Sequence, residues 1–317
     1  MRVLVVGGTE FVSLHLVRSL LRAGHEVAAL NRGRHPERLP AGVRTLVADR
    51  KDHAAVRAAL GGERVDALVD IAYAPTTGED VDAVLSALDS RLGHALFVST
   101  GRVYDHALPI PYDETTPRSL YWGDYARHKI AGEDVLLRWH RQRGLPVTLV
   151  RPTHVYGPMN TRNNETFFFD RLVRGRPILV PRAGGWLRQF GHVEDLADTM
   201  AAMLGDRRTF GQAYNVTGEE VLTQVGFAEL IADVIKRPLT LVSCPTPPGT
   251  QPPPFGQNLA YECHAVYTTT RVRELGLRPR YTLAGGLAQT FEWYLREGLD
   301  RRDIDFSAEN ALLEHLG

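Results

Sequence analysis

The stretch that decides the fold reads MRVLVVGGTEFVSLHLVRSLLRAGHEVAALNR over residues 1–32. Val3–Val6 form a short apolar run rich in β-branched residues, which is typical of a strand buried on both faces. Apolar residues then recur at helical spacing from Leu14 to Leu21, and Val27–Leu30 form a second apolar run that predicts a strand. A strand–helix–strand unit with a glycine turn after its first strand is the usual cradle for a dinucleotide pyrophosphate, because backbone N–H groups and the positive end of the helix face the phosphates.

The glycine turn departs from the usual spacing of three glycines. Its three positions are occupied by Gly7, Glu10 and Ser13, so only the first is glycine. Serine is small enough for the third position, at which the helix packs on the strand. A carboxylate at Glu10 repels a pyrophosphate unless its side chain turns outward, and an ordinary packing turn remains the alternative. We expect coenzyme contacts along this turn from Gly7, Thr9, Glu10, Phe11 and Val12.

The composition narrows the class of protein. The 317 residues leave room for one or two domains, and Lys+Arg and Asp+Glu both number 37, so the net charge is zero. A neutral chain has no overall attraction to nucleic acid or to an anionic membrane, although a local basic patch is compatible with it. The two cysteines make neither a disulfide framework nor a metal-ligand cluster, so we expect no metal.

The same composition bears on location. No apolar run approaches the roughly 20 residues that span a bilayer. A first strand that begins at residue 2 leaves no room for a signal peptide. We therefore expect a cytoplasmic protein with no membrane partner.

Strand and helix patterns alternate beyond the first unit. Strands are expected at Val43–Val47, Ala67–Ala72 and Ala95–Val98, and helices at Ala54–Leu60 and Val81–Leu92. This strict alternation predicts an α/β fold with a Rossmann-type doubly wound parallel sheet. Ligands of such sheets bind at the carboxyl ends of the strands. In this sequence those ends carry Gly7, Asn31, Asp49, Ala72 and Thr100.

Three residues after the second strand bear on the choice of coenzyme. An acidic residue near this position bonds the ribose 2′-hydroxyl of NAD, whereas arginine accommodates the 2′-phosphate of NADP. Here Asn31 is neutral and both Arg32 and Arg34 are cationic, which favours NADP. The alternative is NAD, with the two arginines forming part of a solvated basic loop.

Residues at the next two strand ends are expected to contact the coenzyme as well. Asp49 carries a carboxylate that suits the adenine amino group, and capping of the following helix is its alternative role. We expect Arg50 and Ala72 to lie against the coenzyme with it.

A tyrosine and a lysine open the helix that follows the fifth strand. Tyr125 and Lys129 are four residues apart, so both side chains can lie on one helix face. A free phenol is too weak an acid to act as a base at neutral pH, but a nearby ammonium favours the phenolate. A hydroxyl from Thr100 at the preceding strand end can share the proton. Alone, the pair is compatible with an ordinary helix surface; after five strands of a parallel sheet it predicts a proton-transfer site.

Several further segments are similar to one known family. The segment VSTGRVY at residues 98–104 resembles the family's serine/threonine segment. The other matching segments are Tyr125 with Lys129, RPTHVYGP at 151–158, RQFGHVED at 188–195, LGLRP at 275–279 and FEWY at 291–294. Together they resemble the extended short-chain dehydrogenase/reductases, the NAD(P)-dependent epimerase/dehydratase family, over nearly the whole chain.

Two features look like one branch of that family. One is the turn without its middle glycine, and the other is FFDRLVRGRP at 168–177, followed by Gly191–Val193. The branch contains the chloroplast stem-loop RNA-binding proteins and their bacterial relatives.

The resemblance implies a coenzyme domain and a smaller C-terminal α/β cap that binds the substrate. Residues 1–158 would form the dinucleotide-binding domain, with residues 188–216 returning to it. Residues 159–187 and 217–317 would form the substrate-binding domain. The proline-rich stretch Cys244–Phe255 is expected as an extended surface loop.

The resemblance also implies roles for particular residues. Thr100, Tyr125 and Lys129 match the catalytic residues, and Lys129 would also bond the nicotinamide ribose. Pro152 and Val155 would lie beside the nicotinamide. The implied substrate contacts are Ser99, Arg102, Asn164 and Arg188.

Asn164 and Arg188 would hold the phosphates of a nucleotide sugar, because a planar guanidinium can donate two bonds at once. A capping asparagine and a surface arginine are the alternatives. No lysine or arginine occurs between Arg237 and Arg271, where sugar-nucleotide epimerases of this family usually have another arginine.

The residues after Thr100 restrict the reaction. Dehydratases and decarboxylases of this family carry acidic residues there, whereas this chain has Gly101 and Arg102, neither of which is an acid or base near neutral pH. Epimerisation of a hydroxyl carbon in a sugar nucleotide or related sugar is therefore the preferred reaction. An NADPH-dependent carbonyl reductase of another small molecule and an RNA-binding protein on the same scaffold are the alternatives, although zero net charge disfavours RNA.

A homodimer is expected from two helices. The helices at Val81–Leu92 and Tyr125–Arg143 carry apolar residues beyond one stripe. Those in the second helix include Val135, Leu136, Leu137 and Trp139. Members of the family commonly pair these two helices into a four-helix bundle.

Overall fold

The computed structural model describes residues 1–71, 75–88, 92–160, 162, 164–181, 184–244 and 262–316. The chain divides into two compact units. The first contains residues Met1–Thr153, Val193–Thr217 and Tyr267–Pro279, and the second contains His154–His192, Gly218–Val266 and Arg280–Gly317. Each unit is described by itself.

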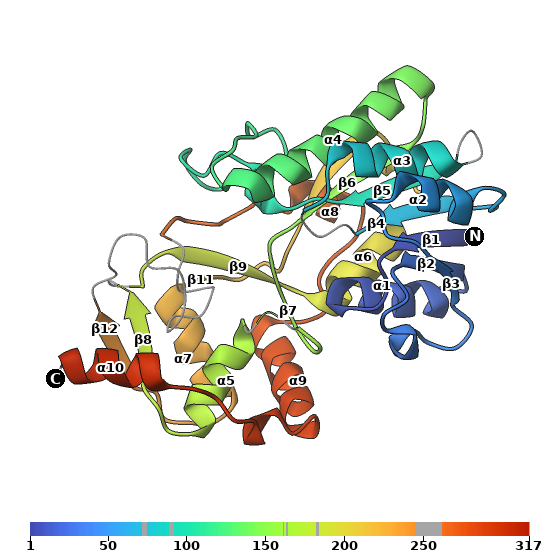
Figure 1. Ribbon diagram of the computed structural model, residues 1–317. Coiled ribbons are helices and arrows are strands. Elements are labelled where there is room, and N and C mark those ends of the chain that lie inside the picture. Colours follow the sequence, from blue (N-terminus) through green and yellow to red (C-terminus); the bar gives the residue numbers. More distant parts are fainter. Residues whose placement is uncertain are drawn as a thin grey trace. The chain divides into compact units, whose positions relative to one another are not determined.

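The first unit is built on a seven-stranded sheet (Figure 1). Its order is β10-β6-β5-β4-β1-β2-β3, and all neighbouring pairs are parallel. The strands are β1 (Arg2–Val6), β2 (Glu26–Asn31), β3 (Arg44–Val47), β4 (Ala67–Asp70), β5 (His94–Val98), β6 (Val147–Pro152) and β10 (Gln212–Val216). The order reverses between β1 and β4, which is where doubly wound sheets bind their ligands. The predicted Rossmann-type sheet is confirmed.

Helices cover both faces of this sheet (Figure 1). One face carries α2 (His53–Leu60), α3 (Gly78–Leu88) and α4 (Gly123–Arg143), and the other carries α1 (Phe11–Arg22) and α6 (Val193–Met203). Short helical turns η1 (Pro36–Arg38), η3 (Gly101–Val103) and η4 (Arg207–Thr209) and the helix α8 (Thr270–Glu274) complete the unit. Because both faces are covered, β1 and β5 read as nearly continuous apolar runs.

The second unit consists of small sheets and helices. Strands β7 (His154–Tyr156), β9 (Leu187–His192) and β11 (Val221–Thr223) form one sheet, and β8 (Ile178–Pro181) pairs with β12 (Leu241–Cys244). The helices are α5 (Glu165–Val173), α7 (Gln224–Val234), α9 (Leu283–Arg296) and α10 (Ser307–Leu316), with the turn η5 (Leu299–Arg301). Its core is aromatic: Phe190 stacks on Phe227 with ring centroids 3.9 Å apart, and Phe168 meets Phe227 edge-on.

The segment 267–279 lies in the first unit, whereas the sequence had placed it in the substrate-binding domain. The reason is a set of polar contacts with distant residues. The Asn215 side-chain amide donates to the carbonyls of Tyr112 (3.3 Å) and Thr268 (3.2 Å), and Arg271 Nε lies 3.6 Å from Glu114 Oε2. Residues 154–158 and 188–192 were expected in the dinucleotide-binding domain, and the structure instead places them in the second unit.

The apolar residues on which a homodimer was expected have partners in their own unit. Val135, Leu136 and Trp139 are buried in the core beside the sheet, and Leu137 packs against the same core. Trp139 Nε1 also donates to Asp82 of α3 at 2.7 Å. These residues therefore stabilise a single copy, and a dimer stays a prediction.

Among the described residues, no helix combines the length and the apolar composition that crossing a bilayer requires.

Candidate coenzyme-binding and catalytic site

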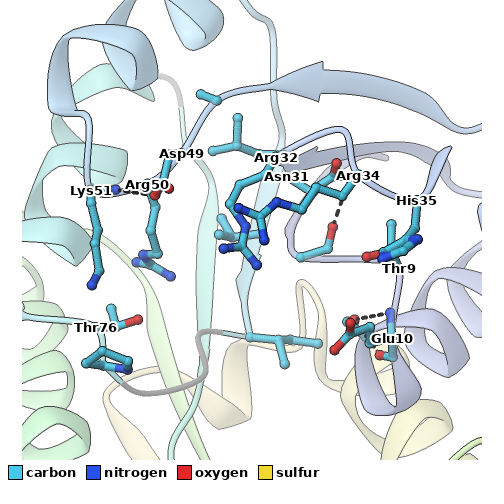
Figure 2. Close-up of a pocket in the computed structure, with 17 residues that line it drawn as sticks. Thr9, Glu10, Asn31, Arg32, Arg34, His35, Asp49, Arg50, Lys51 and Thr76 are labelled. Carbon is cyan, nitrogen blue, oxygen red and sulfur yellow. Dashed lines mark hydrogen bonds between the residues drawn. The ribbon is translucent and has the colours of Figure 1, made fainter.

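A cavity of about 460 Å³ opens at the carboxyl ends of β1 to β4 in the first unit (Figure 2). The residues that line it come from the strand ends and from the loops that follow. They are Val6, Gly7, Thr9, Glu10, Ser13, Leu30, Asn31, Arg32, Arg34, His35, Ala48, Asp49, Arg50, Lys51, Ile71, Pro75 and Thr76. The cavity thus brings together Gly7, Thr9, Glu10 and the residues predicted at the ends of β2 and β3. Phe11 and Val12 are buried beside the turn and do not line it, and Ala72 lies outside the described residues.

The glycine turn has the backbone that the sequence requires. Gly7 has a φ of +117°, a left-handed conformation that side chains rarely adopt. Ser13 Oγ accepts from Glu10 N at 3.3 Å and donates to Glu10 O at 2.6 Å, so this small residue ties the turn to α1. The Glu10 carboxylate lies 3.9 Å from Arg38, and its side chain is half exposed. Because the Glu10 carboxylate lies near the positive charge of Arg38 on η1, its repulsion of a pyrophosphate would be weaker than expected from the sequence.

An asparagine shapes the turn that follows β2. Asn31 Oδ1 accepts from Gly33 N at 2.8 Å, which turns the chain sharply after the strand. The exposed side chains of Arg32 and Arg34 then point into the cavity (Figure 2). His35 and Lys51 line the same cavity and were not among the predicted residues. These four basic side chains therefore line this cavity.

Asp49 and Arg50 occupy different roles at the end of β3. The Asp49 carboxylate accepts from Lys51 N at 3.0 Å, in a turn, and helix α2 is capped by Asp52 instead. Arg50 forms a two-bond ion pair with Asp70 of β4, with both N–O distances 2.9 Å. Asp70 is 1% exposed. Its partner was missed, although a carboxylate at the end of a buried strand requires one.

Lys129 and Tyr125 lie in the first two turns of α4. Lys129 is buried, and its ammonium donates to Val98 O at the end of β5 (2.8 Å) and lies 5.4 Å from the Phe97 ring centroid. Tyr125 is half buried. Thr100 is buried, and its hydroxyl accepts from Arg102 N at 3.3 Å. Within the described part of the chain, the Tyr125 hydroxyl forms no hydrogen bond with Thr100 or Lys129.

The residues after Thr100 are fixed by aromatic rings. A Cβ at Gly101 would lie 2.6 to 2.9 Å from ring atoms and the hydroxyl of Tyr267, so only glycine fits there. The Arg102 guanidinium carbon lies 4.5 Å from the ring centroid of Trp122 and 5.7 Å from that of Tyr125. Ser99, also a predicted substrate contact, is buried at the same strand end.

A buried polar network that sequence reasoning missed anchors α4 to the sheet. Arg151 of β6 donates to both carboxylate oxygens of Glu133 (2.8 and 2.7 Å) and to the Tyr104 hydroxyl (3.0 Å). Burial opposes ionisation of Glu133, but the hydrogen bonds and charge of Arg151 outweigh it and lower the pKa of Glu133. Burial raises the pKa of Tyr104 to about 12, so its hydroxyl stays protonated and donates to Asn215 Oδ1 at 2.6 Å.

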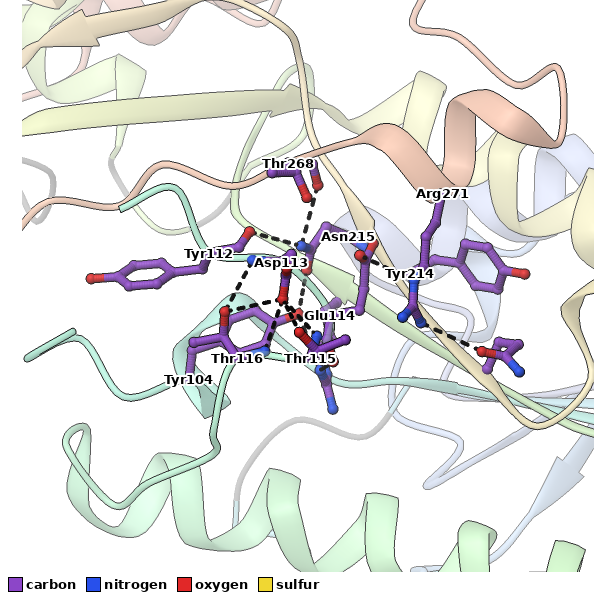
Figure 3. A network of polar contacts seen from close by, with 12 residues as sticks. Tyr104, Tyr112, Asp113, Glu114, Thr115, Thr116, Tyr214, Asn215, Thr268 and Arg271 are labelled. Atoms are coloured by element: carbon purple, nitrogen blue, oxygen red, sulfur yellow. Dashed lines mark hydrogen bonds and ion pairs between the residues drawn. The ribbon is translucent and has the colours of Figure 1, made fainter. Parts of the chain in front are cut away.

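The network extends to the segment 267–279, which belongs to the first unit (Figure 3). Asn215 N donates to Glu114 Oε1 at 2.8 Å, and Arg271 lies on the other oxygen of that carboxylate. Burial raises the pKa of Glu114, while the Asn215 N–H and the charge of Arg271 oppose the rise. The loop between Thr100 and Tyr125 is thereby held at Tyr104 and Glu114.

The predicted residues of the later segments have separate surroundings. Pro152 ends β6, and Val155 lies in β7 of the second unit. Asn164 precedes α5 without capping it, and among the described residues its buried Oδ1 has no hydrogen-bond partner, so the capping alternative is wrong. Arg188 is fully buried and donates to the carbonyls of Leu187 (3.3 Å) and Cys263, so it is not a surface arginine. Their contact with a substrate stays a prediction.

Comparison with known proteins places these features in a family. The model of the NAD dependent epimerase/dehydratase family matches residues 3–217. The chloroplast stem-loop binding protein of 41 kDa b from Arabidopsis thaliana is 30% identical over 98% of this chain and 84% of its own. A dTDP-glucose 4,6-dehydratase from Streptomyces niveus is 28% identical over 93% of each chain.

Solved structures share the fold. A UDP-glucose 4-epimerase from Thermotoga maritima, solved with UDP-glucose, superposes with a TM-score of 0.80 at 20% identity, covering 94% of this chain and 100% of its own. The Thermus thermophilus UDP-glucose 4-epimerase, solved with NAD, gives 0.78 at 24% identity, covering 93% and 99%. The family and branch that the sequence motifs indicated are thereby confirmed, and the chain belongs to the NAD dependent epimerase/dehydratase family.

Proposed function

We propose that this protein is an NAD(P)-dependent enzyme that oxidises and re-reduces a hydroxyl carbon of a nucleotide sugar or related sugar. The observation that carries the proposal is the pairing, within one unit, of the strand-end cavity with a buried lysine four residues after Tyr125. The Lys129 ammonium donates to Val98 O at the end of β5, and the carboxyl ends of these parallel strands lie at the edge of the sheet that carries the cavity. The names of relatives, dTDP-glucose 4,6-dehydratase and UDP-glucose 4-epimerase, support a nucleotide sugar as substrate.

The cavity suits the adenosine half of a dinucleotide. The backbone turn at Gly7 and the amino terminus of α1 would face the pyrophosphate, and Asp49 would lie on the adenine side. Arg32, Arg34 and Lys51 offer cations to a 2′-phosphate, and we infer a preference for NADP on that ground. NAD, which the Thermus thermophilus neighbour binds, is the alternative.

The residues of the site divide the chemistry among them. The Tyr125 hydroxyl would take the proton of the substrate hydroxyl and later return it, acting as general base and then general acid. The Thr100 hydroxyl accepts from Arg102 N and keeps its own proton for a bond to the substrate oxygen. Lys129 would stabilise the phenolate by charge and hold the coenzyme ribose. The bound coenzyme would supply the acceptor and donor of the hydride.

A second reading is an RNA-binding protein, as the name of the Arabidopsis relative suggests. Zero net charge over 317 residues gives no general attraction to phosphate backbones. The retention of Thr100, Tyr125 and Lys129 together favours the enzyme.

Native mass spectrometry of the purified protein tests the proposal. We expect a dinucleotide adduct, either retained through purification or formed on addition of NADP(H). A retained adduct that does not exchange with isotopically labelled coenzyme indicates an epimerase, and a freely exchanging one indicates a carbonyl reductase. Failure of saturating NADP(H) and NAD(H) to bind, with a folded protein, would refute the enzyme and favour the RNA reading.

A further inference from the structure

The last helix of the chain, α10, is held to the second unit through a charged side chain (Figure 1). Of its ten residues, all of which the structure describes, only Glu309 is buried. Leu312 and Leu313 are half buried and pack at the edge of the aromatic core. A surface helix ordinarily buries an apolar stripe. A helix whose one buried side chain is a carboxylate depends instead on the partner of that carboxylate.

The partner is Arg171 of α5. Its Nη2 donates to Glu309 Oε1, and its Nη1 donates to Phe167 O at 2.8 Å. The guanidinium carbon lies 3.4 Å from the Phe167 ring centroid, so the ion pair packs against an aromatic face. The Arg171 and Glu309 side chains are 9% and 5% exposed. Removing one of them would therefore leave the other charge buried and uncompensated.

The chain before α10 is fixed on α5 by a second arginine. Arg174, at the end of α5, donates to Asp300 O at 2.9 Å and to Arg302 O at 2.7 Å. Residues 300–302 are thereby anchored. Residues 303–305, which follow, form neither helix nor strand and are exposed or half exposed. They provide a short hinge between the anchored chain and α10.

Beyond the hinge, Arg176 makes contacts that are open to solvent. Its Nη2 donates to Asn310 Oδ1, its Nε lies 3.9 Å from Glu309 Oε2, and its guanidinium carbon lies 4.2 Å from the Phe306 ring centroid. The Arg176 side chain is 23% exposed and Asn310 is exposed, so these contacts contribute little to stability. The attachment of α10 therefore rests mainly on Glu309 and on its two half-buried leucines.

Helix α5 is anchored by contacts of its own. Phe168 and Phe169 are fully buried in the aromatic core. Phe168 meets Phe227 edge-on with ring centroids 5.4 Å apart, and the Phe169 ring centroid lies 5.4 Å from that of Tyr294. None of these four rings belongs to residues 303–316. Helix α5 would therefore keep its place without α10.

We propose that residues 303–316 form a strap that opens as a unit about residues 303–305 when Arg171 and Glu309 separate, while the rest of the second unit stays folded. Both charges regain water on opening, which offsets part of the attraction that is lost. The segment FFDRLVRGRP at 168–177, which contains Arg171, Arg174 and Arg176, is then the docking site of the chain's own C-terminal residues. This inference goes beyond the proposed function and is independent of it, because neither coenzyme nor substrate takes part.

Hydrogen–deuterium exchange of the full-length protein, read by mass spectrometry at pH 7.5, measures the opening. Amides of α10 in the wild type should be at least about tenfold less protected than those of α7, a helix of the same unit, because separate opening costs less than unfolding of the unit. Glu309→Leu leaves Arg171 buried without its counter-ion. It should speed exchange in α10 by at least about a further tenfold and leave α7 unchanged.

Two further variants assign the effect to the ion pair. Arg171→Met together with Glu309→Leu replaces the pair by two apolar side chains, and exchange in α10 should return to within about threefold of the wild type or become slower. Glu314→Leu is the matched control, because Glu314 is an exposed carboxylate of the same helix, and the new residue has the same helix propensity. Its exchange in α10 should equal that of the wild type.

Every other pattern of exchange refutes the strap. Equal protection of α10 and α7 in the wild type would show that the segment does not open separately. Equal exchange in Glu309→Leu and Glu314→Leu, or a double variant as fast as Glu309→Leu, would exclude the ion pair as the closure. Faster exchange of α7 and α10 together would show that the whole unit loosens. If Glu309→Leu fails to fold, the wild-type comparison and the double variant, which carries no buried charge at this place, still decide.

Discussion

His94 predicts a specific loss of stability in acid. It is the first residue of β5, is 2% exposed, and lies in the first unit. Gly205 N donates to its Nδ1 at 3.1 Å, so Nδ1 has no proton and Nε2 carries it. Nε2 lies 2.9 Å from Thr148 Oγ1, and the Thr148 hydroxyl donates its own hydrogen bond to Thr209 Oγ1. A protonated His94 would place two N–H groups against each other at Gly205.

The magnitude follows from the pKa of His94. Burial lowers this pKa from 6.5 to about 4, with the charge of Asp206 opposing the change. In the unfolded chain His94 therefore becomes protonated near pH 6.5, whereas in the folded protein it stays neutral down to about pH 4. Between these values the unfolded state holds more protons, so the free energy of unfolding falls as the pH falls. The full difference of about 2.5 pH units corresponds to about 3 kcal/mol, of which about 2 kcal/mol is lost by pH 5.

Urea unfolding of wild type and His94→Gln at pH 7.5 and pH 5.0 measures this contribution. Glutamine can accept from Gly205 and donate to Thr148 but does not titrate. The loss of stability between the two pH values should be smaller in His94→Gln by about 2 kcal/mol. His315→Gln, which removes an exposed histidine of α10, should keep the wild-type loss. An identical pH dependence in His94→Gln and the wild type would refute the neutral, buried state of His94.

Three further outcomes test the site and the assembly. Tyr125→Phe should lower turnover by about 10²–10⁴-fold while coenzyme still binds, and Lys129→Met should impair both turnover and coenzyme binding. Thr100→Ala should cause a smaller loss of turnover than Tyr125→Phe, because water can replace its hydroxyl. Near-normal turnover of Tyr125→Phe in steady-state kinetics would exclude Tyr125 as the acid/base. Calorimetry should show tighter binding of NADP(H) than of NAD(H), and the double variant Arg32→Gln, Arg34→Gln should reverse this order; a clear NAD preference of the wild type would contradict the reading of the β2 loop. Light scattering should give a dimer at micromolar concentration, and a monomer there would remove the proposed pairing of α3 and α4.

The sheet could be predicted because its signals are local. Val3–Val6 and Ala95–Val98 are apolar whatever their neighbours are, and parallel strands of a doubly wound sheet carry their ligands at one edge. The positions of Gly7 and Asn31 at that edge followed from strand order alone, and the cavity contains both. Helix α3 is longer than expected at its start, at Gly78, since acidic residues in the first turn extend it ahead of the apolar pattern.

The pairings between distant residues could not be predicted. Arg50 was expected against the coenzyme, and the ion pair with Asp70, twenty residues later, fixes its guanidinium. Nothing in the spacing of the two residues joins them; only the adjacency of β3 and β4 to the same cavity does. The burial of Arg188 is of the same kind, because Cys263, whose carbonyl it meets, is 75 residues away.

Gly101 shows both a local sequence signal and a contact with a residue distant in the sequence. From the sequence, the glycine only removes an acid from the site and disfavours dehydration. In the structure, the Tyr267 ring requires the glycine, and Tyr267 belongs to a segment that the family resemblance assigned to the other domain. The next residue, Thr268, donates its backbone N–H to Tyr112 O at 2.9 Å, which holds the segment against the loop that precedes Tyr125. The missing acid and the reassigned segment are therefore one feature, because the Tyr267 ring occupies the place that an acidic side chain at residue 101 would need.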